Sequence, residues 1–166
     1  AFLWDDGPMS QIVERSFDKV HEHNGVTALT LSAAFVVKKH RQALLSLLPK
    51  IDILFGNEDE VKALFETDDI NYALSELRKV ANISVTTMGK EGVVVMSDEA
   101  FIKSDAIKVA KVVDATGAGD AFAGGFLYAF SKGYDLNYCT QIGLKAAADI
   151  IQKVGARSEK KLEHLL

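Results

Sequence analysis

The sequence predicts an α/β fold in which a mostly parallel sheet has helices on both faces, giving three layers. Short, unbroken apolar runs alternate along the chain with segments whose apolar residues recur at helical spacing. Strands that are buried on both faces have such Val/Ile/Leu-rich runs, and this alternation is typical of strand-helix-strand units. Ligands of such sheets bind beyond the carboxyl ends of the strands, so the residues that follow each strand are the candidates for a site.

Apolar runs bounded by turn or charged residues predict four strands in the first half of the chain. These strands are expected at 1–4, 26–31, 51–55 and 83–87. Apolar residues at helical spacing predict the helices that separate them. These helices are expected at 9–20, 37–48 (ended by Pro49), about 61–65, and 70–80. The two periods therefore alternate regularly as far as residue 87.

The second half opens with two short apolar runs, "GVVVM" and "AFI", that Ser97-Asp98 separates. They predict a hairpin of short strands. A further strand is expected to end at 111–113, directly before the stretch "DATGAGDAFAGGF", and a helix is expected over 122–130. The whole chain, 1–166, is expected to form a single domain.

Composition and charge exclude several classes of protein. The chain has 48% hydrophobic and 25% charged residues, which is ordinary for a globular domain. Its net charge is -4 and its longest basic cluster is the short run 38–41, so no nucleic-acid partner is expected. No apolar run approaches the roughly 20 residues that cross a bilayer, so no membrane partner is expected. The single cysteine, Cys139, and the lack of a signal-peptide pattern favour the cytoplasm.

The stretch from Asp114 to Phe126 places glycines 117 and 119 where a strand is expected to run into a helix. Glycines allow a tight turn, and the unpaired N–H groups of a helix start attract anions such as phosphate. Two interpretations of Asp120 are open on spacing alone. It favours the helix dipole, or it is a base beside a phosphate-binding turn. The dinucleotide fingerprint is excluded because its third glycine position is Phe122, and no Walker lysine motif occurs.

The chain resembles the ribokinase/PfkB superfamily of carbohydrate kinases. "DATGAGD" is similar to the family's second signature, apart from Ala115 where threonine is usual. The segments "DILFGNEDE", "TTMGKEG" and "AAADIIQKVGAR" resemble the family's N-x-x-E segment, its nucleotide loop and its closing helix and turn, and "LTLSAAF" is most similar to the adenosine-kinase branch. The resemblance implies a three-layer, ribokinase-like (Rossmann-like) fold. It also implies that this chain is a C-terminal nucleotide-binding and catalytic portion, without the N-terminal part and lid.

The resemblance implies ATP-dependent phosphoryl transfer to a hydroxyl of a small molecule. Asp120 would be the catalytic base, and the N–H groups of Gly117, Ala118 and Gly119 would form the anion hole. The acceptor would be a nucleoside such as adenosine, taken at its 5′-hydroxyl, or alternatively a sugar. A nucleotide-binding fragment without turnover, and an unrelated α/β domain with structural glycines, stay open, as does a homodimer of the full-length protein.

The resemblance also implies the cofactors and the residues that hold them. Mg²⁺ would be held through water by Asn57 and Glu60, although an asparagine followed three residues later by a glutamate also forms a capping box. The remaining nucleotide contacts would come from Thr87, Gly89, Gly92, Thr116, Gly143 and Ala147. Gly143, Ala146 and Ala147 would form a flat wall for adenine, and close helix packing explains them equally well. K⁺ beside Asp114, Thr116 and the carbonyls near Gly155 is left open, because "GARSEKK" departs from the family's spacing.

The segment "LTLSAAF" places Ser32 and Phe35 just after an expected strand. An apolar ring next to a small polar group suits a nucleobase better than a free sugar, which needs several polar partners. The alternative is that Phe35 only packs against the following helix.

Overall fold

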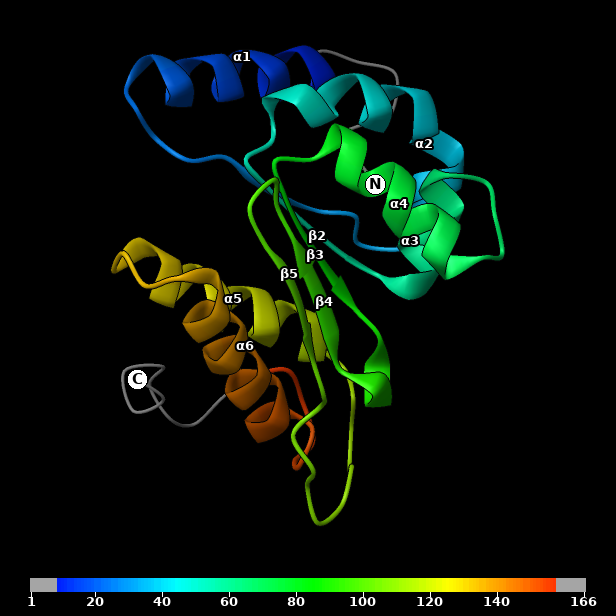
Figure 1. Ribbon diagram of the computed structural model, residues 1–166, viewed down its shortest axis with the longest axis vertical. Coiled ribbons are helices and arrows are strands. Elements are labelled where there is room, and N and C mark those ends of the chain that lie inside the picture. Colours follow the sequence, from blue (N-terminus) through cyan, green and yellow to red (C-terminus); the bar gives the residue numbers. More distant parts are fainter. Residues whose placement is uncertain (1–8, 158–166) are drawn as a thin grey trace. The chain divides into compact units, whose positions relative to one another are not determined.

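A computed structural model describes residues 9–157, which form two compact units. One unit comprises the chain up to Thr86 together with Met96–Phe101, and the other comprises Thr87–Val95 together with the chain from Ile102. The strand expected at 1–4 lies outside the described residues. The five described strands form one sheet in the order β1-β2-β3-β4-β5 (Figure 1).

The first unit alternates helices and strands as the sequence predicts. Its elements are α1 (Met9–Glu22), β1 (Ala28–Thr30), α2 (Ala34–Leu47), a 3-10 turn (Leu48–Lys50), β2 (Ile53–Asn57), α3 (Glu58–Leu64), α4 (Ile70–Val80) and β3 (Ile83–Thr87). β1 and β2 are parallel, with Ala28 opposite Ile53 and Thr30 opposite Phe55. Helix α3 contacts α2, α4 and β2, and its Val61 and Leu64 are buried in the core.

The boundaries of several first-unit elements differ from the sequence-based predictions, and helices α1 and α3 are among them. The strand expected at 26–31 is reduced to Ala28–Thr30, and the strand expected at 51–55 lies at Ile53–Asn57. Helix α2 begins at Ala34, three residues before the predicted start, because Val36 and Val37 are buried against the core. Pro49 lies within the 3-10 turn that follows α2, where its missing N–H costs no helical hydrogen bond.

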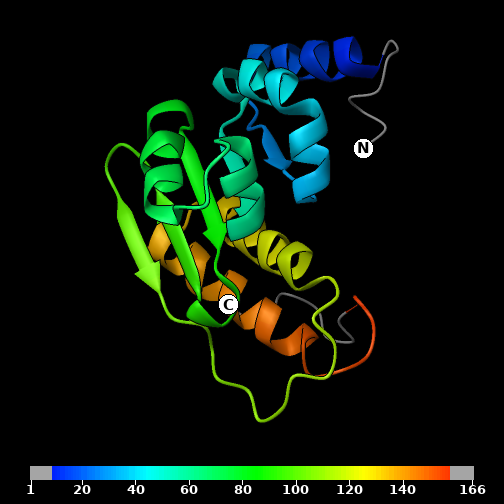
Figure 2. The same ribbon diagram turned by 90° about the vertical axis from the view of Figure 1, so that its right-hand side faces the viewer.

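The second unit contains most of a short hairpin, whose turn (Met96–Phe101) belongs to the first unit, followed by two packed helices. A 3-10 turn (Gly89–Glu91) precedes β4 (Val93–Met96) and β5 (Phe101–Ser104), and the helices are α5 (Ala118–Ser131) and α6 (Leu136–Ile150). The two helices lie side by side in both views (Figures 1 and 2). Gly125 of α5 allows this close approach, because an added Cβ would lie 2.9 Å from the carbonyl oxygen of Ile142.

The prediction of a strand that ends at 111–113 is wrong. Residues 105–113 have no regular secondary structure, and Val112 and Val113 are 58% and 47% exposed. The N–H of Val113 donates to the carbonyl oxygen of Ile151 at 2.7 Å, after the end of α6, and not to a neighbouring strand. The helix that follows is longer than the predicted 122–130, because its first turn includes the Gly-Asp pair 119–120.

Candidate phosphate-binding site at the start of helix α5

Gly117 forms the turn into α5 in a conformation that other residues rarely adopt. Its φ is 77° and its ψ is 5°, which is the left-handed region. A Cβ at this position would also lie 2.6 Å from the Cβ of Ala156, in the turn that follows α6. Both the backbone conformation and the close neighbour therefore require glycine at 117.

Backbone N–H groups at the start of α5 lack an acceptor in the described part of the chain. Among residues 9–157, no acceptor takes the N–H of Gly117, Gly119 or Asp120. The N–H of Ala118 donates to the carbonyl oxygen of Ala115 at 3.1 Å, and its part in an anion hole stays a prediction. Unpaired N–H groups and the positive end of the helix dipole act together, so this helix start favours an anion.

The carboxylate of Asp120 is exposed in the first turn of the same helix. The residue that caps α5 is Gly117, and no side chain accepts a hydrogen bond at this cap. Asp120 is therefore not used as a hydrogen-bonding cap. Its carboxylate is available for both the dipole interpretation and the base interpretation.

Asp114 orders the loop that leads into α5. Its Oδ1 accepts the N–H of Thr116 at 2.8 Å, and its Oδ2 accepts the N–H of Gly155 at 3.1 Å. Hydrogen bonds from Thr116 and then from Gly155 lower the pKa of the Asp114 carboxyl below its ordinary value. Thr116 itself is exposed. Sequence reasoning missed the direct bond between Asp114 and Gly155, because nothing in the local spacing pairs residues 41 positions apart.

Asn57 and Glu60 form the capping box that their spacing predicts. The Glu60 N–H donates to Asn57 Oδ1 at 2.9 Å, while Glu60 Oε2 accepts the Asn57 N–H at 2.9 Å. Glu60 Oε1 also accepts from Asn57 Nδ2 at 2.8 Å, and the residue is only 5% exposed. The structural interpretation of the pair is thus confirmed. Within residues 9–157, no group of three or more histidine, cysteine or acidic side chains could hold a metal.

The predicted nucleotide loop is the tight turn between β3 and β4. Thr87 ends β3, and the Met88 N–H donates to the Gly92 carbonyl oxygen at 2.8 Å. Gly92 has a φ of 96° and is buried, and a Cβ there would overlap the Ser104 carbonyl oxygen and lie 2.7 Å from the Ala106 nitrogen. Gly89 has a φ of 57° and faces open space. Gly92 is therefore required by packing, while Gly89 leaves the surface of the turn accessible.

Gly143 has the helix-packing role that the sequence left as one of two interpretations. A Cβ at 143 would lie 2.8 Å from Cζ of Phe122, so the Phe122 ring of α5 covers this position of α6. Ala146 is buried and Ala147 is half-buried. An adenine wall at this part of α6 stays a prediction.

The residues expected to contact the acceptor lie between β1 and the first turn of α2. Ser32 is exposed and has a φ of 69°, an uncommon value for a residue other than glycine. Phe35 lies in the first turn of α2, and it is 71% exposed, so its ring is not packed in the core. The packing alternative for Phe35 is wrong, since Val36 and Val37 fill that role.

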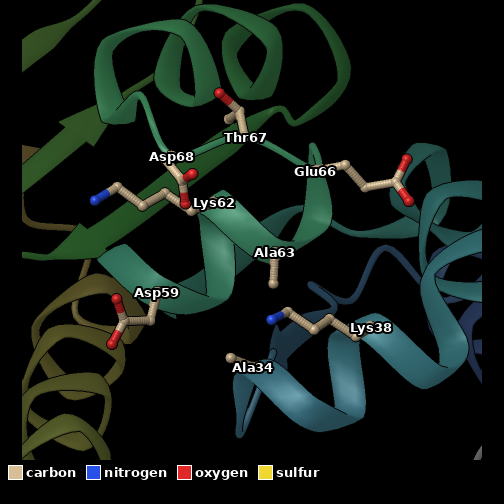
Figure 3. A pocket seen from close by; sticks show the side chains of 8 residues that line it. All are labelled: Ala34, Lys38, Asp59, Lys62, Ala63, Glu66, Thr67 and Asp68. Carbon is tan, nitrogen blue, oxygen red and sulfur yellow. The ribbon is translucent and has the colours of Figure 1, made fainter.

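A groove that the sequence did not predict lies between α2 and α3. It has a volume of about 650 Å³ and is lined by Ala34, Lys38, Asp59, Lys62, Ala63, Glu66, Thr67 and Asp68 (Figure 3). Two of its charged side chains have partners close by, since Lys62 pairs with Glu58, and Arg41 Nη1 lies 3.2 Å from Glu66 Oε2. The groove therefore carries both signs of charge and has no preference for one class of anion or cation.

None of the helices in the described part of the chain is long and apolar enough to span a membrane. The described residues form an α/β protein in which a glycine turn leads into helix α5. The family of pfkB carbohydrate kinases matches residues 8–162, and the chain belongs to this family. The sequence-based assignment to a kinase family is thereby confirmed.

Three relatives illustrate the similarity. Adenosine kinase 1 of Arabidopsis thaliana is 32% identical over 178 residues, which cover 96% of this chain and 52% of that protein. The ribokinase of Lactococcus lactis is 34% identical over 163 residues, covering 95% and 53%. The structure of adenosine kinase from Sinorhizobium meliloti superposes with a TM-score of 0.93 at 34% identity, over 98% of this chain and 50% of that one.

The predicted ribokinase-like α/β fold is confirmed by this superposition. The chain spans about half the length of each of these relatives.

Proposed function

We propose that the whole protein transfers the γ-phosphoryl group of ATP to a hydroxyl of a small molecule. The observation that carries the proposal is the start of α5, where the N–H groups of Gly119 and Asp120 have no acceptor within residues 9–157 and the Asp120 carboxylate lies in the same helical turn. Negative charge on the transferred phosphoryl group is stabilised by such preorganised donors. Membership of a family of carbohydrate kinases supports this assignment.

In the proposed reaction, Asp120 accepts the proton of the acceptor hydroxyl. The acceptor oxygen then bonds to the γ phosphorus, and the bond from that phosphorus to the β-γ bridging oxygen breaks, which releases ADP. The N–H groups of Gly117, Gly119 and Asp120 donate to the phosphoryl oxygens. Gly117 also contributes the turn that directs them, and the half-buried Thr87 and the exposed Gly89 contribute the surface for the nucleotide.

Asn57 and Glu60 are the proposed magnesium residues. Glu60 is 5% exposed and both of its carboxylate oxygens accept a hydrogen bond from Asn57, which holds the carboxylate in one orientation, and carboxylate and amide oxygens are ligands that suit Mg²⁺ and its waters. When bound, Mg²⁺ neutralises charge on the phosphates. The contribution of this chain is to keep a buried carboxylate fixed at the start of α3.

For the acceptor, we propose a purine nucleoside such as adenosine, phosphorylated at its 5′-hydroxyl. The exposed ring of Phe35 and the strained, exposed Ser32 support it, because a nucleobase stacks on an apolar ring. A sugar is the second candidate, because the similarity to a ribokinase is as extensive as that to an adenosine kinase. For location we propose the cytoplasm, where the single buried thiol of Cys139 would stay reduced.

The experiment that tests the activity uses Asp120→Asn in the whole protein. A proton acceptor that does not bind the nucleotide predicts a loss of kcat of about 100-fold or more with ATP affinity nearly unchanged. Asp135→Asn is the matched control, because Asp135 also lies at a helix start and asparagine still caps α6. If kcat of Asp120→Asn stays within about tenfold of the wild type, Asp120 is not the base.

Side-by-side kcat/KM values for adenosine, ribose and fructose decide the acceptor. A higher value for either sugar would overturn the nucleoside proposal and leave the kinase proposal in place.

A further inference from the structure

The turn that follows α6 reaches back to the loop that precedes α5. The Val113 N–H donates to the Ile151 carbonyl oxygen at 2.7 Å, and the side chain of Asp114 joins the same turn through Gly155. The Cβ of Ala156 fills the space in front of Gly117. Three successive contacts therefore hold residues 151–156 against residues 113–117.

The carboxylate of Asp114 is the only charged group in these contacts, and both of its oxygens accept N–H groups. Oδ1 accepts from Thr116, within the loop, while Oδ2 accepts from Gly155, across to the turn. A carboxylate that accepts backbone N–H groups makes charge-assisted hydrogen bonds, which are stronger than those between neutral groups. Asp114 thus stabilises the loop 113–117 through Thr116 and links this loop to the turn 151–156 through Gly155.

The family resemblance implied a monovalent cation near Asp114, held also by carbonyl oxygens near Gly155. The Gly155 backbone presents its N–H to the carboxylate, and the positive end of an N–H group repels a cation. The Thr116 N–H approaches the other oxygen in the same way. Each Asp114 oxygen is thus already bonded to a backbone N–H, so the contact between the loop and the turn is made without an ion.

We propose that Asp114 is a positioning residue that ties the turn 151–156 to the start of α5 through these two hydrogen bonds, with no ion needed to close the contact. By fixing both sides of Gly117, it keeps the N–H groups of Gly119 and Asp120 directed at one place. Asp114 itself touches neither phosphate nor acceptor. The contacts between residues 113–117 and residues 151–156, which we call the clasp, are a feature of the fold alone. Only their effect on phosphate binding rests on the proposed function.

The clasp is tested first by amide hydrogen exchange of this chain, measured by NMR. Asp114→Ala removes both acceptors, so the amides of Thr116 and Gly155 are expected to exchange about tenfold faster or more. Asp135→Ala is the matched control, because it removes a carboxylate bond of 2.8 Å to the Tyr138 N–H at the start of α6. That variant is expected to leave the Thr116 and Gly155 amides unchanged.

If Asp114→Ala does not fold, Asp114→Asn replaces one acceptor oxygen with a donor group, and at least one of the two amides is expected to lose protection. Unchanged exchange of both amides in a folded variant would overturn the clasp.

Independence from a cation is tested by titrating the wild-type chain with potassium chloride, using tetramethylammonium chloride to match ionic strength. The Thr116 and Gly155 amide resonances are expected not to shift between the two salts. A saturable shift specific to K⁺ would overturn the proposal.

The consequence for phosphate binding is measured with Mg-ATP as the probe. Asp114→Ala is expected to weaken its binding by about tenfold, and Asp135→Ala to leave it unchanged. Equal binding by Asp114→Ala and wild type would overturn the positioning role. If the wild-type chain binds no Mg-ATP while the amides behave as expected, the clasp stands and the proposed function fails.

Discussion

Replacing Gly117 with alanine tests whether the turn into α5 is shaped by its own backbone or also by the turn after α6. Alanine at a φ of 77° costs about 1–2 kcal/mol of folding free energy, because its Cβ crowds the backbone. The new Cβ would also lie 2.6 Å from the Cβ of Ala156, so one of the two segments must move. Such overpacking adds about 1–3 kcal/mol. Gly117→Ala is therefore expected to lower the free energy of unfolding by about 2–5 kcal/mol.

Gly133→Ala separates the two contributions. Gly133 has a φ of 80° and lies in the same unit, but an added Cβ there would meet nothing within 4 Å. Its substitution is expected to cost only the backbone term, about 1–2 kcal/mol. Urea unfolding, followed by circular dichroism, measures both variants.

A rescue experiment completes the comparison. Ala156→Gly removes the nearest contacting atom, so the double variant Gly117→Ala, Ala156→Gly is expected to recover part of the loss. If Gly117→Ala is no less stable than Gly133→Ala, the contact with Ala156 has no energetic weight and the reasoning is refuted.

Three further predictions concern other parts of the site and its supports. Gly92→Ala is expected to lower the free energy of unfolding by about 3 kcal/mol or more, because the added Cβ would overlap backbone atoms of Ser104 and Ala106. Gly89→Ala, whose Cβ would lie in open space, should lower it by only about 1 kcal/mol, and urea unfolding measures both variants. Glu60→Gln keeps one acceptor for the capping box, so in the whole protein it should change the melting temperature little. It should, however, raise the Mg²⁺ concentration that is needed for activity. An unchanged Mg²⁺ concentration would leave the pair purely structural.

The third of these predictions concerns pH. Partial burial raises the pKa of Asp52, but hydrogen bonds from Thr27 and His21 outweigh burial and lower this pKa overall. The resulting stabilisation is present above the ordinary pKa of an unfolded aspartate, and it is lost as the pH falls through the lower folded value. Asp52→Asn should therefore destabilise the chain more at pH 7 than at about pH 3 in urea unfolding. An equal loss at both pH values would show that the charge of Asp52 is not involved.

The elements that the sequence predicts best are those with local signals. Helix α4 runs from Ile70 to Val80 as predicted, because its apolar residues have clear helical spacing and Asp69 caps its first turn. The capping box of Asn57 and Glu60 and the glycine turn at 117 are equally local. Each depends on residues within a few positions of one another.

The parts that the sequence does not predict depend on distant partners. Residues 111–113 have the apolar pattern of a strand, but the Val113 N–H pairs with Ile151 beyond α6. The space in front of Gly117 is filled by Ala156, and Asp114 is held by Gly155. The use of the Ala118 N–H by Ala115 depends on the exact backbone angles of the turn, which residue types alone do not specify. Spacing therefore located the candidate site, and the tertiary contacts determine which of its groups are available.

The central claim is that the first turn of α5 binds phosphate, and Gly119→Ala tests it most directly. Gly119 is helical, and an added Cβ would meet no protein atom within 4 Å, so alanine should leave the fold as stable as before or stabilise it by up to about 1 kcal/mol. The same methyl group would be attached beside the Gly119 N–H, which has no acceptor among residues 9–157, and would add bulk where a phosphate has to approach. The account predicts weaker Mg-ATP binding by calorimetry with no loss of stability. Unchanged affinity for Mg-ATP in the stable variant would contradict it.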